Sequence, residues 1–153
     1  MDAELRAELI KRYREGPAVI EQAIAECTEA ELDRSVEGWT PRQVIHHTAD
    51  SEMTSAIRLR KLVAEDRPLI PGYDEELFAR RLHYGDRPLE GSLVAIRGAR
   101  ESSASLLDHL TEEEWARAGT HAESGAYSVY TWLEIYAAHC HDHADQIRRA
   151  RKP

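Results

Sequence analysis

The stretch GWTPRQVIHHTADSEM, residues 38–53, decides the fold because it combines a strong helix start with a cluster of chemically useful side chains. Thr40 is a good N-cap residue, Pro41 suits the first helical position, and Gln43, three residues after the cap, completes a capping box. Apolar residues then recur every three or four positions. The sequence therefore predicts a long amphipathic helix from about Pro41 to Glu65.

Further helices are indicated on both sides of this one by the same spacing and by two T-x-x-E capping boxes. Three of them are long. We expect these from about Asp2 to Ile24 with a kink or restart at Gly16–Pro17, from about Leu89 to Leu110, and from a cap at Ser128 to Arg151. Three are short, and we expect them from Thr28 to about Val36, from Asp74 to Arg81, and from Thr111 to near Gly119.

Residues 66–91 contain three prolines and three glycines, which is typical of a long connection rather than a helix. Residues 120–128, THAESGAYS, have the composition of a loop. The chain shows no convincing run of alternating apolar and polar residues that would predict strands. We therefore predict an all-α fold, a four-helix bundle with a long crossover connection and short extra helices, in a single domain spanning residues 1–153.

The composition argues against several function classes. The chain has 28 acidic and 20 basic residues and a formal net charge of −8, so it has no broad basic surface for nucleic acid. No stretch has the roughly 20 apolar residues of a membrane span, and the N-terminus is charged where a signal peptide is apolar. Cys27 and Cys140 form no C-x-x-C pair. We expect a cytoplasmic protein that acts on a small-molecule substrate, without nucleic-acid or membrane partners.

The stretch AAHCHDHADQI, residues 137–147, places three histidines within five residues of the last predicted helix. His139 and His143 are four residues apart, so they lie on one face about 6 Å apart along the helix axis. His141 points elsewhere. Two neutral imidazoles that face a bundle interior are suited to a divalent metal ion, although histidines at this spacing also occur as ordinary core or surface residues.

A third ligand must come from another helix, and the adjacent residues His46 and His47 are the candidates. Neighbouring residues on a helix point about 100° apart, so one metal ion normally takes only one of them. Both histidines fall at the margins of the apolar face of their helix. Periodicity leaves the choice open, and the alternative to a metal ligand is that one histidine is exposed to solvent and the other lies at the rim of the core.

Three segments resemble the DinB superfamily of helical bundles, in particular its YfiT-like branch of metal-dependent hydrolases and bacillithiol-type thiol transferases. These segments are residues 38–53, 71–79 and 121–147, and their order and spacing match across nearly the whole chain. The resemblance implies that His47, His139 and His143 bind one divalent metal ion. Zn or Ni is favoured, with Fe, Co and Mn as alternatives.

Glu52 departs from the family pattern, which has D-S-H-M where this chain has D-S-E-M. The apolar face of the predicted helix places Glu52 inward. One interpretation is a partly buried carboxylate paired with Arg58 or Arg80. The other is a catalytic role as a general base, or an extra group at the metal. This change also implies that the substrate side of the site differs from that of the relatives.

Four other residues are predicted to lie near the metal ligands or the mouth of the site, namely Asp50, Tyr73, Asp74 and Cys140. Asp50 lies one helical turn after His47 and would orient an imidazole N–H or remain exposed. Tyr73 and Asp74 would line the mouth of the site or cap the short helix in the connection. Cys140 is rotated about 100° from His139, so we expect a buried and inert thiol.

Three imidazoles leave a coordination position open for water or substrate, which favours an enzyme. The two available chemistries are hydrolysis and the transfer of a low-molecular-weight thiol, as co-substrate, to an electrophilic small molecule. The resemblance favours thiol transfer. A metal-dependent hydrolase is the alternative, and a non-catalytic, stress-related metal-binding bundle is a third reading. Because relatives often pair through bundle helices, we also expect a homodimer.

Overall fold

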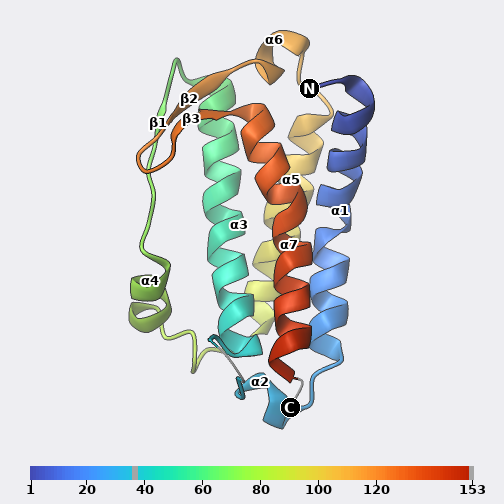
Figure 1. The fold of residues 1–153 in the computed structure, drawn as a ribbon, viewed down its shortest axis with the longest axis vertical. Coiled ribbons are helices and arrows are strands. Elements are labelled where there is room, and N and C mark those ends of the chain that lie inside the picture. Colours follow the sequence, from blue (N-terminus) through green and yellow to red (C-terminus); the bar gives the residue numbers. More distant parts are fainter. Residues whose placement is uncertain (36–37, 152–153) are drawn as a thin grey trace.

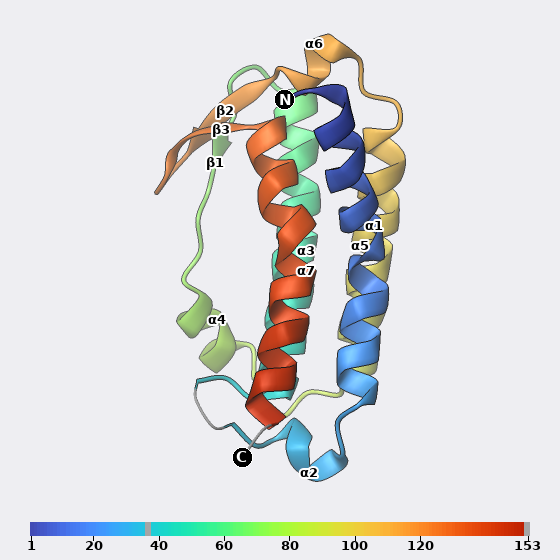
Figure 2. The same cartoon turned by 45° about the vertical axis from the view of Figure 1, so that its right-hand side comes forward.

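Four long helices dominate the computed structural model, which describes residues 1–35 and 38–151 (Figure 1). Helices α1 (Ala3–Ala25) and α7 (Val129–Arg151) run in one direction along the bundle, and α3 (Pro41–Ala64) and α5 (Glu90–Leu107) run in the other (Figure 2). None of the helices in the described residues is both long and apolar enough to cross a membrane. The predicted four-helix bundle is confirmed.

The connection between α3 and α5 must return along the outside of the bundle, because both helices begin at the same end (Figure 1). It carries strand β1 (Leu69–Ile70) and the short helix α4 (Glu75–Arg81). Asp74 caps α4, and its side chain accepts a hydrogen bond from the backbone N–H of Leu77 at 2.8 Å. The predicted crossover and its short helix are therefore both present.

A small sheet is the main difference from the prediction. Strands β2 (Ala118–His121) and β3 (Gly125–Ser128) form an antiparallel hairpin, and β1 pairs with β2 in parallel. The loop predicted for residues 120–128 is therefore wrong. These strands are two to four residues long, too short for alternation to be visible in the sequence. Gly125, with φ of +80°, supplies the left-handed conformation at the end of the hairpin turn.

Both T-x-x-E capping boxes form, and each starts a short helix that ends earlier than predicted. Helix α2 spans Glu29–Leu32, and the predicted end at Val36 lies outside the described residues. Helix α6 spans Glu112–Trp115, because the chain enters β2 soon afterwards. Helix α5 stops at Leu107 rather than Leu110, and Thr111, with an extended backbone, then caps α6.

A buried polar layer divides the apolar core of the bundle. On α3, one apolar cluster ends at Ala49 and the other begins at Leu59. The buried residues of α3 between them are polar or charged, namely Ser51, Glu52, Ser55 and Arg58. Buried polar groups need partners. The candidate site lies in this layer.

Helix α1 continues through Gly16 and Pro17, so it does not restart there. Because proline has no N–H, Pro17 leaves the carbonyl oxygen of Tyr13 without its usual helical partner. Nη1 of Arg100 donates to that oxygen at 2.6 Å. A Cβ atom at Gly16 would collide with the guanidinium of Arg100. The Gly-Pro pair therefore makes room, and frees an acceptor, for a buried arginine from α5.

Candidate metal centre

The side chains of His47, His139 and His143 meet between α3 and α7. One ring nitrogen from each residue lies within 4.8 Å of the other two. The ring of His143 stands edge-on to both others, with its centroid 4.5 Å from that of His139 and 4.8 Å from that of His47. His47 is buried and the other two are half-buried. The structure brings together the three residues that the resemblance implies.

The hydrogen bonds of His139 and His143 fit a bound cation. Nδ1 of His139 lies 2.8 Å from Oε1 of Glu52, and Nδ1 of His143 lies 2.8 Å from Oε1 of Gln146. These oxygens only accept, so each neutral ring carries its proton on Nδ1. The two Nε2 atoms then face each other with lone pairs, 3.1 Å apart. In a tetrahedral zinc site with Zn–N bonds near 2.0–2.1 Å, two nitrogens are about 3.3 Å apart.

His47 completes the group from α3. Its Nδ1 is buried without a hydrogen-bond partner among the described residues. Burial, together with the neighbouring imidazoles, lowers the pKa of His47 to about 3 and that of His143 to about 4. Both rings are therefore neutral near pH 7, which is the form that binds a metal ion. The half-buried ring of Trp39 packs against His47 with centroids 4.9 Å apart.

His46 has a different role from its neighbour. Its Nδ1 lies 2.8 Å from Oγ of Ser92 and its Nε2 lies 3.0 Å from the carbonyl oxygen of Arg87. Both ring nitrogens are thus used to tie α3 to α5 and to the segment before it. The alternative in which one of the two adjacent histidines is exposed is wrong, because Tyr84 and the segment before α5 cover this part of α3.

Glu52 is fully buried, and its Oε1 accepts hydrogen bonds from Nη2 of Arg100 and from Nδ1 of His139, both at 2.8 Å. Burial opposes the charged form, but Arg100 and His139 hold the pKa of Glu52 below its usual range. The predicted pairing with Arg58 or Arg80 is wrong. The actual partner comes from α5, and the sequence does not reveal which helices pack against each other.

This arrangement anchors the ring of His139 through its Nδ1. A carboxylate that accepts the Nδ1 proton of a ligating histidine fixes the ring and increases the basicity of its Nε2. Arg100 is itself held by the carbonyl oxygen of Tyr136 at 2.6 Å and by the ring of Tyr13, 4.2 Å from its guanidinium carbon. A direct catalytic role for Glu52 stays a prediction.

Three other candidates do not belong to the group of His47, His139 and His143, although Sγ of Cys140 lies within 4.8 Å of a ring nitrogen of His139. Asp50 accepts a hydrogen bond from the hydroxyl of Tyr84 at 2.5 Å, so it orients a tyrosine and not a histidine. Cys140 is completely buried, as expected, and burial raises the pKa of its thiol. Nε2 of His141 lies 3.1 Å from the carbonyl oxygen of Arg12, away from the other two histidines of α7.

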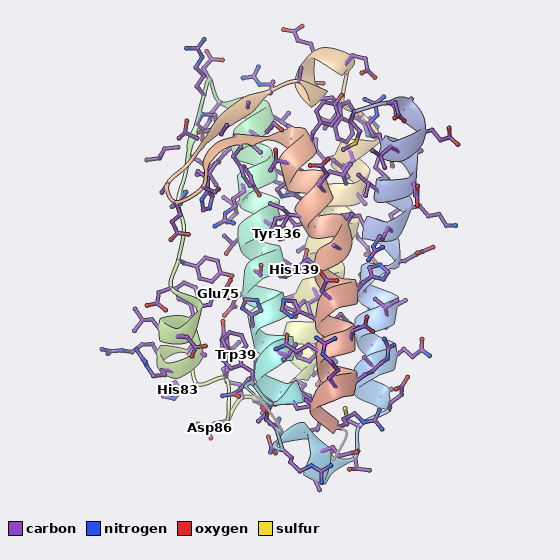
Figure 3. The ribbon with its side chains drawn as sticks, viewed as in Figure 1. Trp39, Glu75, His83, Asp86, Tyr136 and His139 are labelled. Carbon is purple, nitrogen blue, oxygen red and sulfur yellow. The ribbon has the colours of Figure 1, made fainter. Side chains whose placement is uncertain are left out.

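A cavity of about 240 Å³ opens beside His139. Its walls come from α3, α7, the segment before α4 and the β2–β3 hairpin, so the sheet that sequence reasoning missed shapes part of the site. Figure 3 shows Tyr136 and His139 on α7, with Glu75 at α4 on the side where the crossover passes. The lining includes Ser51, Arg58, Tyr73, Glu75, Glu123, Tyr136 and His139.

A family model described as the DinB superfamily matches residues 12–147 of the chain. The protein OB0782 of Oceanobacillus iheyensis is 36% identical over 142 residues, which cover 92% of this chain and 82% of that protein. YfiT of Bacillus subtilis is 31% identical over 147 residues, which cover 94% of this chain and 83% of YfiT. The names of both relatives mark them as proposed metal-dependent hydrolases.

Two kinds of solved structure resemble this fold. That of Bacillus subtilis YfiT superposes with a TM-score of 0.92 at 30% identity, covering 98% of this chain and 87% of YfiT. It is described as a probable metal-dependent hydrolase with an unusual four-helix bundle topology. A mycothiol-dependent maleylpyruvate isomerase superposes with a TM-score of 0.73 at 14% identity, covering 92% of this chain and 60% of the isomerase. The second likeness shows a shared fold.

Proposed function

The chain belongs to the DinB superfamily, and from this premise we propose that it is a divalent-metal-dependent enzyme whose ion is held by His47, His139 and His143. One observation carries the proposal. The three imidazoles converge beside a cavity, and within the described residues no further histidine, cysteine or carboxylate joins all three; Glu52 and Cys140 form a second group that shares only His139. Three protein ligands with an open position are typical of catalytic sites, whereas structural sites are closed by four. This supports an enzyme over a sealed metal-binding module.

The residues of the chain prepare the site in separate ways. A divalent ion bound there would supply Lewis acidity, which brings the pKa of a coordinated water or thiol toward neutrality. Glu52 and Gln146 orient the rings of His139 and His143 by accepting their Nδ1 protons. Trp39 covers His47 from the side. These contacts keep the ligand nitrogens directed at one point and reduce the reorganisation that binding requires.

We propose that the reaction is the transfer of a low-molecular-weight thiol to an electrophilic small molecule. Oε1 of Glu52 accepts hydrogen bonds from Arg100 and His139, and although Oε2 has no partner among the described residues, the side chain is fully buried and does not line the cavity. Hydrolysis gains from a free general base that takes a proton from water, whereas a thiol that binds as its thiolate needs none. A protein of the same fold is described as mycothiol-dependent, which is in keeping with this choice.

Hydrolysis is the second candidate, favoured by the names of the relatives with more than 30% identity. In that case the general base would be one of the two carboxylates that line the cavity, Glu75 or Glu123. Both side chains are exposed, so their protons exchange readily with solvent. We propose a small-molecule substrate in either case.

The test compares metal-loaded protein with protein treated with a chelator. Bacillithiol or mycothiol is mixed with monochlorobimane, and the fluorescent conjugate is followed. We expect faster conjugation with the metal-loaded protein, loss of that rate in His143→Ala, and retention in His141→Ala, whose ring lies outside the centre. If the chelated control conjugates equally fast while an ester or amide is hydrolysed only by metal-loaded protein, the hydrolase proposal replaces the transferase proposal.

A further inference from the structure

Arg58 of α3 is a buried cation without an anionic partner among the residues that the structure describes. Its side chain is 9% exposed. Nη2 donates to the carbonyl oxygen of Pro71 at 2.7 Å, and Nη1 donates to the hydroxyl of Tyr136 at 3.3 Å. Nε has no partner among the described residues, and no carboxylate there forms an ion pair with this guanidinium. A guanidinium has five N–H donors, so several remain available.

Arg100, the second buried arginine, differs from Arg58 because it has a counterion. Arg100 is 1% exposed, and its charge is balanced by the carboxylate of Glu52 at 2.8 Å. An unpaired charge in a protein interior is costly, because burial removes the solvation that water supplies. The contrast between Arg100 and Arg58 indicates that the second charge is matched by a group that is not part of the chain.

The position of Arg58 points to the group that it would bind. Arg58 and His139 line the same cavity, so one small molecule there can reach both residues. Ser51 also lines this cavity, as does Tyr73, whose ring centroid lies 5.9 Å from the guanidinium carbon and whose hydroxyl is buried without a partner in the described residues. The wall around Arg58 therefore offers hydrogen-bond donors close to a positive charge, which suits a carboxylate.

Two carboxylates, those of Glu75 and Glu123, line the cavity as well. Both residues are exposed to solvent, and neither is paired with Arg58. Water and salt screen exposed charges far more than buried ones. The carboxylates of Glu75 and Glu123 therefore do not neutralise the buried guanidinium, and its charge is available to a ligand.

We propose that Arg58 binds a carboxylate of the molecule whose other end occupies the open position at His47, His139 and His143. The ligand class is a small carboxylic acid with a metal-binding atom, such as a thiol, a few bonds away from the carboxylate. This inference rests on the proposed function for the metal end of the ligand. The arginine end is a property of the chain alone.

The test uses protein loaded with Co²⁺ and two thiols of equal length, 3-mercaptopropionate and its neutral amide. A sulfur-to-cobalt charge-transfer band reports thiol binding directly, without any turnover. Hydrogen bonds to charged groups contribute about 1.5–3 kcal/mol, so wild-type protein should bind the carboxylate roughly 10- to 100-fold more tightly than the amide. In Arg58→Gln that preference should disappear while the Kd of the amide stays the same.

The control variant is Arg60→Gln, because Arg60 is an exposed arginine of the same helix that hydrogen-bonds to Ser102 and Ser103. It should retain the full preference for the carboxylate. If Arg58→Gln does not fold, Arg58→Lys keeps the charge without the planar fork and should show a reduced preference. A preference that survives unchanged in the Arg58 variants would come from chelation of the metal by the carboxylate and would overturn the inference.

A second experiment, on metal-free protein, distinguishes a failure of this inference from a failure of the proposed function. If neither thiol gives a charge-transfer band, the open coordination position is refuted, and Arg58 is then judged on metal-free protein. Ligand binding raises the melting temperature by mass action. Excess glutarate should raise it for chelated wild-type and Arg60→Gln protein and leave Arg58→Gln unaffected. An equal rise in all three proteins, or none in wild type, would contradict an anion site at Arg58.

Discussion

Glu52 and His139 are joined by a hydrogen bond of 2.8 Å between Oε1 and Nδ1. In the D-S-H-M pattern of the family, a histidine occupies the position of Glu52. An ionised carboxylate accepts the Nδ1 proton and leaves Nε2 free for a metal ion, whereas an imidazole would first have to present the correct tautomer. Arg100 makes the substitution tolerable, because it balances the buried negative charge.

Glu52→Gln tests this contact. The amide keeps the size of the side chain but removes its charge and leaves Arg100 buried without a counterion. We expect metal affinity to fall about 10- to 100-fold, as for other groups that orient a ligating histidine. Loss of one partner of a buried pair should also lower the free energy of unfolding by about 3–5 kcal/mol. Competition with a chromophoric chelator and urea unfolding measure the two effects.

Once Glu52→Gln is saturated with metal, its conjugation rate should change little, because Glu52 lies behind His139 and does not line the cavity. A large loss of rate at full metal occupancy would instead support the catalytic role that the sequence allowed. An unchanged metal affinity would show that the carboxylate does not position His139.

Gly16→Ala tests the packing of the Arg100 guanidinium against α1. The added Cβ would meet the guanidinium, so the variant should lose about 1–3 kcal/mol of unfolding free energy through overpacking. Gly98→Ala is the matched control, because a Cβ at this α5 residue meets no atom within 4 Å. Alanine is a better helix former than glycine, so the control should be neutral or stabilised by up to about 1 kcal/mol. Equal stability of both variants in urea would contradict the proposed packing.

Removal of the metal should destabilise the wild-type protein. A ligand present at about 1,000 times its Kd stabilises the folded state by about 4 kcal/mol, which corresponds to roughly 8–16 °C in a chain of this size. Differential scanning calorimetry with and without a chelator gives this shift. His143→Ala should melt at the same temperature in both conditions. A chelator effect of equal size in that variant would place the ion elsewhere.

The expected homodimer is a proposal for solution measurement. Sedimentation equilibrium at micromolar concentration should give twice the mass of one chain. A monomer mass over the whole concentration range would contradict it.

The long helices could be predicted because each has apolar residues at helical spacing, and Thr40 or Ser128 caps two of them. The β2–β3 hairpin could not be predicted, since its strands are too short to show an alternation of apolar and polar residues. The i, i+4 pair His139 and His143 was visible in the sequence because both residues belong to one helix.

The contacts between different helices could not be predicted from the sequence. Arg100 lies 48 residues after Glu52, and only the packing of α3 against α5 joins them. The choice of His47 over His46 came from the family resemblance, and its physical reason is the pair of hydrogen bonds that occupy both ring nitrogens of His46. The burial of Arg58 depends on the crossover segment that supplies the carbonyl oxygen of Pro71.

The metal content of purified variants tests the three-histidine centre most directly. Each protein is incubated with excess Zn²⁺, desalted and analysed by inductively coupled plasma mass spectrometry. Wild-type, His46→Ala and His141→Ala protein should each retain one ion per chain, because His46 and His141 lie outside the group that converges. His47→Ala, His139→Ala and His143→Ala should retain almost none. One full equivalent of zinc in folded His143→Ala protein would contradict the account.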